Sequence, residues 1–293
     1  SLVGSEMCIR DSAETGETVW HRSMSEQFGL LSTYGGRTNF PVIFEDLVFI
    51  SGVSTGWGDD SLPAHRVFAM DKLTGELLWI LGTRPRPEDT TYSTPIMTRF
   101  GDQDAMVFGA SDGSVYAVQP RTGAVIWKYE VSIRGLNQTP LIVGNRVFYG
   151  HSEKNSADTT IIGAVFALDG TMQGDLTDAD LLWKVPGETI GRAAPLYLDG
   201  RLYAVDDGGT LLVLDAESGK EISRYRLGRI MFGSPVYGDG KIYLGEATGR
   251  FYILRPTEEG VEIVHQTRLN NEEILGSPII ADGRVYLPTI GAI

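Results

Sequence analysis

The sequence predicts an all-β fold built from repeated four-stranded antiparallel units, and two recurring patterns in its 293 residues carry this prediction. The first pattern is Ala-x-Asp-x-x-Thr-Gly-x-x-x-Trp, which is complete at residues 69–79. An apolar run ends at Asp71, whose carboxylate can accept hydrogen bonds from turn amides, while Gly75 tolerates a positive φ. Four to five residues between two strands indicate an antiparallel hairpin.

Copies of this hairpin recur along the chain. Gln119 replaces the Asp in the second copy, and a longer loop at residues 170–179 interrupts the third. In the fourth copy Ser223 stands where Trp is expected, and residues 251–254 begin a fifth, more divergent copy. The Trp position of the pattern is shared by Trp20, Trp79, Trp127 and Trp183.

The second pattern precedes each hairpin and consists of a proline, two or three apolar residues, a turn and an apolar-aromatic pair. Its clearest copies contain the turns Asp239-Gly240 and Asp282-Gly283, and Asp-Gly between apolar runs is a strong hairpin signal. The copies begin at Pro41, Pro95, Pro140, Pro195, Pro235 and Pro278. Four-stranded units repeating every roughly 40–45 residues are typical of the blades of a β-propeller.

These motifs resemble the pyrroloquinoline-quinone-type repeat family of β-propellers, and the match extends from Ala13 onward. The resemblance implies that each repeat Trp packs between neighbouring blades. The family holds quinone-dependent dehydrogenases and non-catalytic scaffolds, such as the lipoprotein of the outer-membrane barrel-assembly machinery. The repeat therefore specifies a fold and leaves the function open.

The repeat divides the chain into blades. We expect about five complete blades, near residues 39–82, 92–130, 136–186, 192–227 and 232–269. Partial blades are expected at both ends of the chain. On this interpretation residues 13–293 are a single β-propeller domain truncated at both ends, a fragment of a seven- or eight-bladed ring. The alternative is that a strand at residues 18–20 closes onto the blade beginning at Pro278, which gives a six-bladed ring.

Residues 1–12 resemble the translation of a sequencing adapter and are predicted to be an artefactual leader. The repeat register supports this, because Ser12 stands where the pattern has Asp. The alternative is a genuine flexible N-terminus. The sole cysteine, Cys8, lies in this leader, so the remainder offers no thiol nucleophile and no thiolate metal site.

The formal charge of −13 indicates that the chain does not bind nucleic acid, because acidic surfaces repel phosphates. No apolar run reaches the length of a membrane span. The resemblance implies a location in the periplasm or at the outer membrane. Membrane association is then expected only through a lipoprotein anchor that this chain does not contain.

The loops that enter the first strand of each blade are predicted to rim a central channel. The candidate ligand or partner contacts there are Tyr92, Arg134, Asn137, Arg192, Arg229, Phe232 and Glu273. The three arginines recur in successive blades, and converging guanidinium groups bind carboxylate or phosphate bidentately. The alternative is that each arginine pairs with an acidic residue of a neighbouring blade. Trp57 lies outside the repeat pattern, so it is predicted either to contact a partner or to pack over the propeller face.

The other motifs in the sequence do not indicate a catalytic or metal site. Residues 109–113 match Gly-x-Ser-x-Gly, but they join two strands, whereas a nucleophile elbow needs a strand-to-helix turn. The four histidines lack metal-ligand spacing, and the aspartates at residues 175–180 lack the spacing of a calcium loop and are predicted to lie in a solvated loop. Similarity to a quinone enzyme requires a calcium site, a catalytic Asp and usually a vicinal cysteine pair. No family motif falls on the possible ligands Asn137, Asp206 and Glu246.

The sequence therefore predicts a non-catalytic β-propeller scaffold that binds a protein or peptide partner in the bacterial cell envelope. We expect no catalytic residue, no metal site and no cofactor. The alternative is a fragment of a dehydrogenase that uses pyrroloquinoline quinone (PQQ) and calcium to oxidise alcohols or sugars. A sensor that binds a small ligand through the arginine rim is a third possibility.

Overall fold

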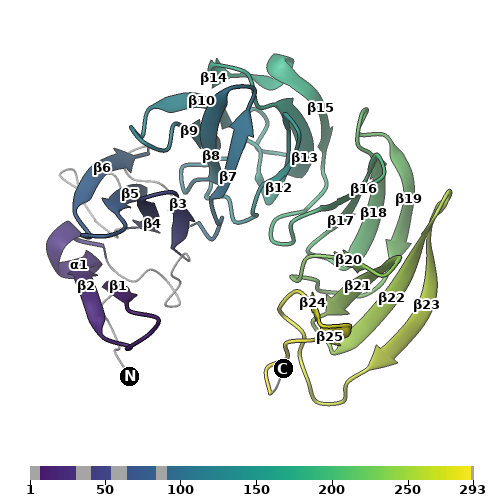
Figure 1. Ribbon diagram of the computed structural model, residues 1–293. Coiled ribbons are helices and arrows are strands. Elements are labelled where there is room, and N and C mark those ends of the chain that lie inside the picture. The colour runs from purple at the N-terminus through teal and green to yellow at the C-terminus, as the bar shows by residue number, and fades with distance from the viewer. Residues whose placement is uncertain (1–6, 31–40, 54–64, 84–90, 292–293) are drawn as a thin grey trace. The chain divides into compact units, whose positions relative to one another are not determined.

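The computed structural model describes residues 7–30, 41–53, 65–83 and 91–291. Contacts within the chain divide it into two compact units. The first comprises residues 1–137 and 170–177, and the second comprises residues 138–169 and 178–293. Strands dominate both (Figure 1), and none of the helices in the described ranges has the length and hydropathy of a membrane span.

The first unit begins with a hairpin and a short helix, which are followed by two larger sheets. The hairpin and helix are β1 (Met7–Asp11), β2 (Thr18–Ser23) and α1 (Met24–Phe28). Sheet 1 contains β3 (Val42–Phe44), β4 (Leu47–Val53), β5 (His65–Asp71) and β6 (Leu77–Gly82). Sheet 2 contains β7 (Ile96–Phe100), β8 (Gln103–Gly109), β9 (Ser114–Val118), β10 (Val125–Glu130) and β14 (Gly174–Leu176).

The second unit contains three four-stranded sheets, a 3-10 turn η1 (Asp178–Asp180) and a final hairpin. Sheet 3 contains β11 (Leu141–Val143), β12 (Arg146–Lys154), β13 (Ile162–Asp169) and β15 (Leu181–Pro186). Sheet 4 contains β16 (Leu196–Leu198), β17 (Arg201–Val205), β18 (Thr210–Asp215) and β19 (Glu221–Arg226). Sheet 5 contains β20 (Val236–Gly238), β21 (Lys241–Glu246), β22 (Arg250–Thr257) and β23 (Gly260–Arg268), and the hairpin contains β24 (Ile279–Ala281) and β25 (Arg284–Tyr286).

These sheets confirm the predicted all-β fold with repeated four-stranded antiparallel units. The turns between β20 and β21 and between β24 and β25 have the predicted Asp-Gly geometry. Both residues of each predicted turn have positive φ, 48° and 69° at Asp239-Gly240 and 50° and 70° at Asp282-Gly283, which defines a type I′ turn, and Asp199-Gly200 in sheet 4 has the same geometry. The number of blades in a complete ring and the single-domain boundary at Ala13 stay predictions.

Each Trp of the repeat contacts the following hairpin. The indole N–H groups donate to carbonyl oxygens at 2.9–3.1 Å, in the pairs Trp20–Lys72, Trp79–Pro120, Trp127–Gly170 and Trp183–Ala216. Trp127 and Trp183 are buried, whereas Trp20 and Trp79 are half-buried. The glycine of the pattern explains the close fit, because a Cβ on Gly123 would lie 2.7 Å from the ring of Trp79.

Replacing Gly123 by alanine should therefore destabilise the protein more than the same change at Gly101. Both glycines have positive φ, 71° and 57°, so both substitutions carry the left-handed backbone penalty. Gly101 has no atom within 4 Å of an added Cβ, whereas Gly123 faces Trp79. We expect Gly123→Ala to cost about 1–3 kcal/mol more in denaturant unfolding. Equal losses of unfolding free energy in the two variants would contradict the packing of the Trp79 ring on Gly123.

The segment at residues 170–179, predicted to be a solvated loop, is instead partly a strand. β14 pairs in parallel with β10, with Gly174 opposite Trp127 and Leu176 opposite Tyr129. Leu176 is buried, and its apolar side chain explains why this insertion packs on the edge of sheet 2. Figure 1 shows β14 beside β10. Asp175 and Asp178 are exposed to solvent as predicted, but they lie on β14 and in η1 and not in an irregular loop.

Residues 7–11, which belong to the predicted leader, also take a regular conformation. β1 pairs with β2, and the side chain of Cys8 is buried. Ser12 Oγ accepts the amides of Glu14 and Thr15 at 3.3 and 3.2 Å, as a carboxylate does in the complete pattern. Ser12 thus occupies the Asp position, as predicted, while the artificial origin of residues 1–12 stays a prediction.

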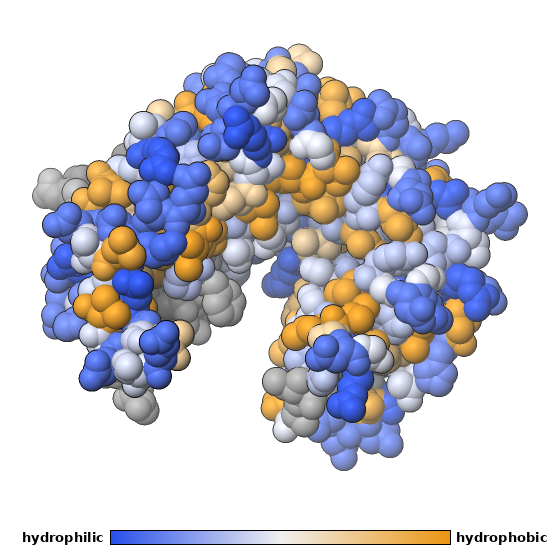
Figure 2. Space-filling model, viewed as in Figure 1, coloured by the Kyte–Doolittle hydropathy of each residue, from blue (hydrophilic) through white to orange (hydrophobic). Residues whose placement is uncertain are grey.

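The hydrophobic core lies between neighbouring sheets of each unit. One cluster joins sheets 1 and 2, another joins sheets 3 and 4, and a third joins sheets 4 and 5. The outermost strands keep some apolar side chains exposed, such as Leu78 on β6 and Val264 on β23. Figure 2 shows such hydrophobic patches among the hydrophilic residues of the surface.

Candidate functional site

The candidate partner-binding site in the second unit lies at the end of sheets 4 and 5 where the entry loops meet the turns between the second and third strands. The amides of Leu227 and Gly228 both donate to the carbonyl of Gly209 at 2.9 Å. Gly209 has a φ of 91°, and an added Cβ would lie 2.5 Å from the carbonyl carbon of Gly228. A glycine is therefore required for the loop to lie on the turn.

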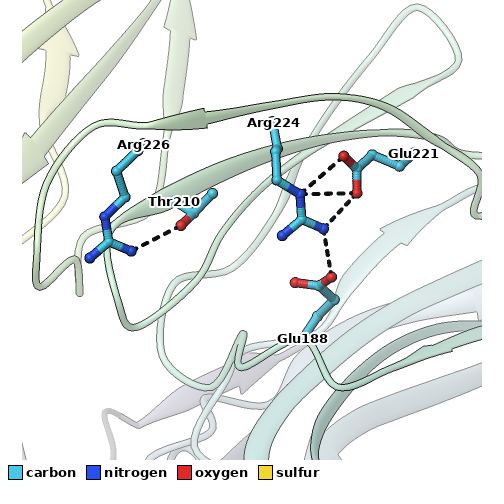
Figure 3. A network of polar contacts seen from close by, with 5 residues as sticks. All are labelled: Glu188, Thr210, Glu221, Arg224 and Arg226. Carbon is cyan, nitrogen blue, oxygen red and sulfur yellow. Dashed lines mark hydrogen bonds and ion pairs between the residues drawn. The ribbon is translucent and has the colours of Figure 1, made fainter.

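A charged network holds the loop between β15 and β16 against sheet 4. Arg224 on β19 donates to Glu188 of this loop at 2.8 Å and to Glu221 of its own strand at 3.0 Å (Figure 3). The neighbouring carboxylates raise the pKa of Arg224, and Arg224 lowers the pKa of Glu221. The loop that carries Arg192 is consequently anchored near its beginning.

Arg192, Asp207 and Phe232 form one cluster at this end of the sheets. Arg192 Nη1 lies 3.1 Å from Asp207 Oδ2, and its Cζ lies 4.4 Å from the centre of the Phe232 ring. Burial raises the pKa of Asp207, and the charge of Arg192 opposes that rise. The side chain of Arg192 is 51% exposed, so this guanidinium is oriented by its neighbours yet open to a partner.

Glu246 anchors the adjacent entry loop from inside the protein. Its fully buried carboxylate accepts the amides of Arg229 and Thr248 at 3.1 and 3.0 Å, and also the hydroxyl of Thr248. Burial alone would raise the pKa of Glu246, but the bonds from Thr248 and the loop amides outweigh it and lower the pKa. The carboxylate therefore fixes the position of Arg229 through its backbone.

Replacing Glu246 by glutamine should cost about 2 kcal/mol at pH 7, because buried amides lose a charged acceptor. The lowered pKa means that this contribution is present above about pH 4.3 and disappears as the pH falls through the folded-state pKa. The two proteins should therefore converge in stability in acid. Denaturant unfolding at several pH values measures this, with the exposed Glu259→Gln as the control. A pH-independent difference would contradict the assignment.

The structure brings together only some of the predicted rim residues. In the first unit Tyr92 and Asn137 are half-buried and Arg134 is exposed. In the second unit Arg229 and Glu273 are exposed, and only Arg192 and Phe232 are shown in contact. Trp57 lies outside the described residues.

The three arginines do not occupy one repeat position. Arg192 and Phe232 each lie three residues before a repeat proline, whereas Arg134 and Arg229 lie six residues before one. Arg192 also pairs with Asp207 of the sheet that its own loop enters, not with a neighbouring blade. Asp207 was missed because its significance depends on the loop packing, although the Asp-Asp-Gly-Gly turn at residues 206–209 was visible in the sequence.

The other candidate groups serve local structure. Residues 109–113 join β8 to β9, and Asp112 accepts the hydroxyl of Tyr116 at 2.8 Å and the amide of Ser114 at 3.1 Å. Asp206 Oδ1 accepts the amide of Thr210 at 2.6 Å. Since Asp206 and Glu246 hold their own turns, they do not fit a calcium site for a quinone. Within the described ranges no three His, Cys, Asp or Glu side chains gather as metal ligands.

Repeated four-stranded sheets with docked indoles define this chain as a β-propeller of the quinoprotein-like repeat class. A family model described as outer membrane protein assembly factor BamB matches residues 7–169 and 169–292. The chain belongs to this family.

Curated relatives fall into more than one functional group. BamB of Yersinia pestis is 24% identical over 88% of this chain and 61% of its own length. The quinoprotein alcohol dehydrogenase PedH of Pseudomonas putida is 25% identical over 63% of this chain and 28% of its own length. Tetrathionate hydrolase of Acidithiobacillus ferrooxidans is 28% identical over 43% of this chain and 28% of its own length. The chain thus spans less than two thirds of each of these relatives.

Solved structures show the same fold. BamB from Moraxella catarrhalis superposes with a TM-score of 0.67 at 16% identity, covering 97% of this chain and 73% of that one. A europium-containing methanol dehydrogenase gives a TM-score of 0.64 at 13% identity, covering 96% and 69%. At these identities the likeness concerns the propeller fold alone.

Proposed function

We propose that this chain is a non-catalytic scaffold that binds a protein or peptide partner in the bacterial cell envelope, during outer-membrane protein assembly. The observation that carries the proposal is the anchored loop end of sheets 4 and 5. There Arg192 stacks on Phe232 and stays half exposed, and Arg229, in the loop that leads to Phe232, is exposed. Arginine and aromatic side chains are enriched in protein interfaces, and arginine binds carboxylates and carbonyl oxygens.

The same family membership supports a location in the cell envelope. We place the protein in the periplasm or at the outer membrane, because its relatives include BamB, an outer membrane protein assembly factor. The charge of −13 makes nucleic acid an unfavourable partner.

Site-specific photocrosslinking in cells that produce the protein tests the proposal. A photoreactive residue at position 192 or 229 should give a discrete adduct with a partner protein. The matched control is position 220, where an exposed lysine lies in a turn at the opposite end of sheet 4. Adducts of equal yield at all three positions, or none at 192 and 229, would overturn the assigned surface.

A quinone-dependent dehydrogenase is the alternative function, and the quinoprotein relatives favour it. The local roles of Asp206 and Glu246 argue against a calcium site built from them. Purified protein should therefore show no dye-linked oxidation of alcohols or sugars after addition of PQQ and calcium. Quinone-dependent turnover would refute the scaffold function even if crosslinks formed.

A further inference from the structure

The repeat lacks its docking Trp between sheets 4 and 5. Ser223 holds on β19 the register position that Trp183 holds on β15. A Cβ added to Gly260 would lie 2.1 Å from Ser223 Oγ and 2.5 Å from the hydroxyl oxygen of Tyr225, whereas one added to Gly219 would lie 2.5 Å from Cε3 of Trp183. The β22–β23 turn therefore lies on Ser223 and on the hydroxyl of Tyr225, which accepts the amide of Val261 at 3.2 Å, and no indole lies between the two sheets there.

A cavity of about 400 Å³, in the range typical of ligand sites, lies beside this turn, between the β16–β17 hairpin of sheet 4 and residues 256–258 of sheet 5. Its walls match those around a docked Trp. Tyr203 holds the register position of Phe148, whose ring centre lies 6.0 Å from that of Trp183. Leu198 likewise holds the position of Val143, which packs against the cluster that contains Trp183. The cavity therefore preserves an aromatic-binding environment whose own aromatic residue is missing.

Charged groups complete the cavity. Arg201 donates to the carbonyl of Thr257 and to that of Glu258 at 2.7 Å, which fixes its guanidinium across the gap between the two sheets. A fixed guanidinium is a good partner for the face of an aromatic ring. Asp199 and Glu258 also line the cavity and are exposed, so its mouth is acidic.

We propose that this cavity binds the side chain of a tryptophan supplied by a basic segment of a partner polypeptide. The indole would replace the one that the repeat lacks, and flanking lysine or arginine residues would face Asp199 and Glu258. The proposal goes beyond the scaffold function and does not depend on it, because the cavity lies among the turns at the opposite end of sheets 4 and 5 from Arg192 and Phe232. The ligand proposed for the cavity is an aromatic side chain flanked by cations, whereas the end of the sheets with Arg192 presents exposed guanidinium groups.

Titration of the isotope-labelled chain with acetyl-Lys-Trp-Lys-amide, followed by NMR, tests the proposal. We expect saturable shifts at the methyl groups of Leu198 and the amides of Thr257 and Glu258. Acetyl-Glu-Trp-Glu-amide should bind at least about threefold more weakly because of the acidic mouth. Acetyl-Lys-Leu-Lys-amide should bind more weakly than the Trp peptide, and equal affinity for the two would overturn the aromatic assignment.

Two variants locate the binding. Arg201→Met removes the guanidinium and should weaken binding at least about fivefold, whereas Arg146→Met, at the equivalent position beside the occupied slot of Trp183, should leave it unchanged. Ser223→Trp supplies the missing indole and should abolish binding of the peptide. Absence of saturable shifts in the unmodified chain, or Arg146→Met weakening binding as much as Arg201→Met, would overturn the proposal. If Ser223→Trp does not fold, the two arginine variants decide.

Discussion

Replacing Trp127 by alanine should lower the free energy of unfolding by about 3–5 kcal/mol, the largest effect expected of a single substitution in this chain. The side chain of Trp127 is fully buried, and its indole N–H donates to the carbonyl of Gly170 at 2.9 Å. The substitution removes a large apolar contact and leaves that carbonyl without its donor. Denaturant unfolding at pH 7 measures the loss.

Two further substitutions make this test specific. Leu78→Ala removes an exposed apolar side chain from the fourth strand of sheet 1 and should change stability by less than about 0.5 kcal/mol. Trp20→Ala should have a smaller effect than Trp127→Ala, because Trp20 is only half-buried. A loss at Trp127 no greater than that at Leu78 would show that docking of the indole on Gly170 does not stabilise the protein.

Acidification from pH 6.5 to pH 4 should destabilise the protein, in part through His65. The side chain of His65 is 1% exposed, and burial lowers its pKa from 6.5 to about 4, with a small opposing effect from Asp112. In this interval the unfolded chain binds a proton that the folded protein does not. Stability is therefore complete above pH 6.5 and falls as the pH drops, by about 3 kcal/mol at pH 4.

His65→Leu separates this contribution from general acid unfolding. Both ring nitrogens of His65 are buried and make no hydrogen bond with the described residues, and the ring lies edge-on to Phe108 with centres 6.1 Å apart. Leucine should therefore be tolerated at pH 7. Between pH 6.5 and pH 4 it should reduce the number of protons taken up on unfolding by about one. Burial also lowers the pKa of His151 to about 4, so His151 accounts for a second proton that is bound on unfolding.

Unfolding monitored from pH 7 to pH 4 provides the measurement, with His265→Gln, an exposed position on β23, as the control. The control should follow the unmodified protein at every pH. Unchanged proton uptake in His65→Leu would contradict the buried neutral imidazole.

The sequence determined the repeat and the local geometry of its turns. Asp71 accepts the amides of Leu73 and Thr74 at 2.8 and 2.7 Å, and the Asp-Gly hairpins have the expected positive φ angles. These features depend on residues close together in the chain, so their side-chain chemistry alone specifies them. The position of each repeat Trp could be predicted for the same reason. The partner of each indole needed the resemblance to known propellers.

Only the tertiary structure decided which long-range neighbours complete each site. The parallel pairing of β14 with β10 joins residues more than forty positions apart and has no local turn signal. The same holds for Arg192, whose partners Asp207 and Phe232 come from two later segments. The functional consequence of Ser223 could not be predicted from the sequence for the same reason. A missing Trp is visible in the sequence, but whether the space closes or stays open depends on how near the next hairpin lies, which is set by packing between sheets.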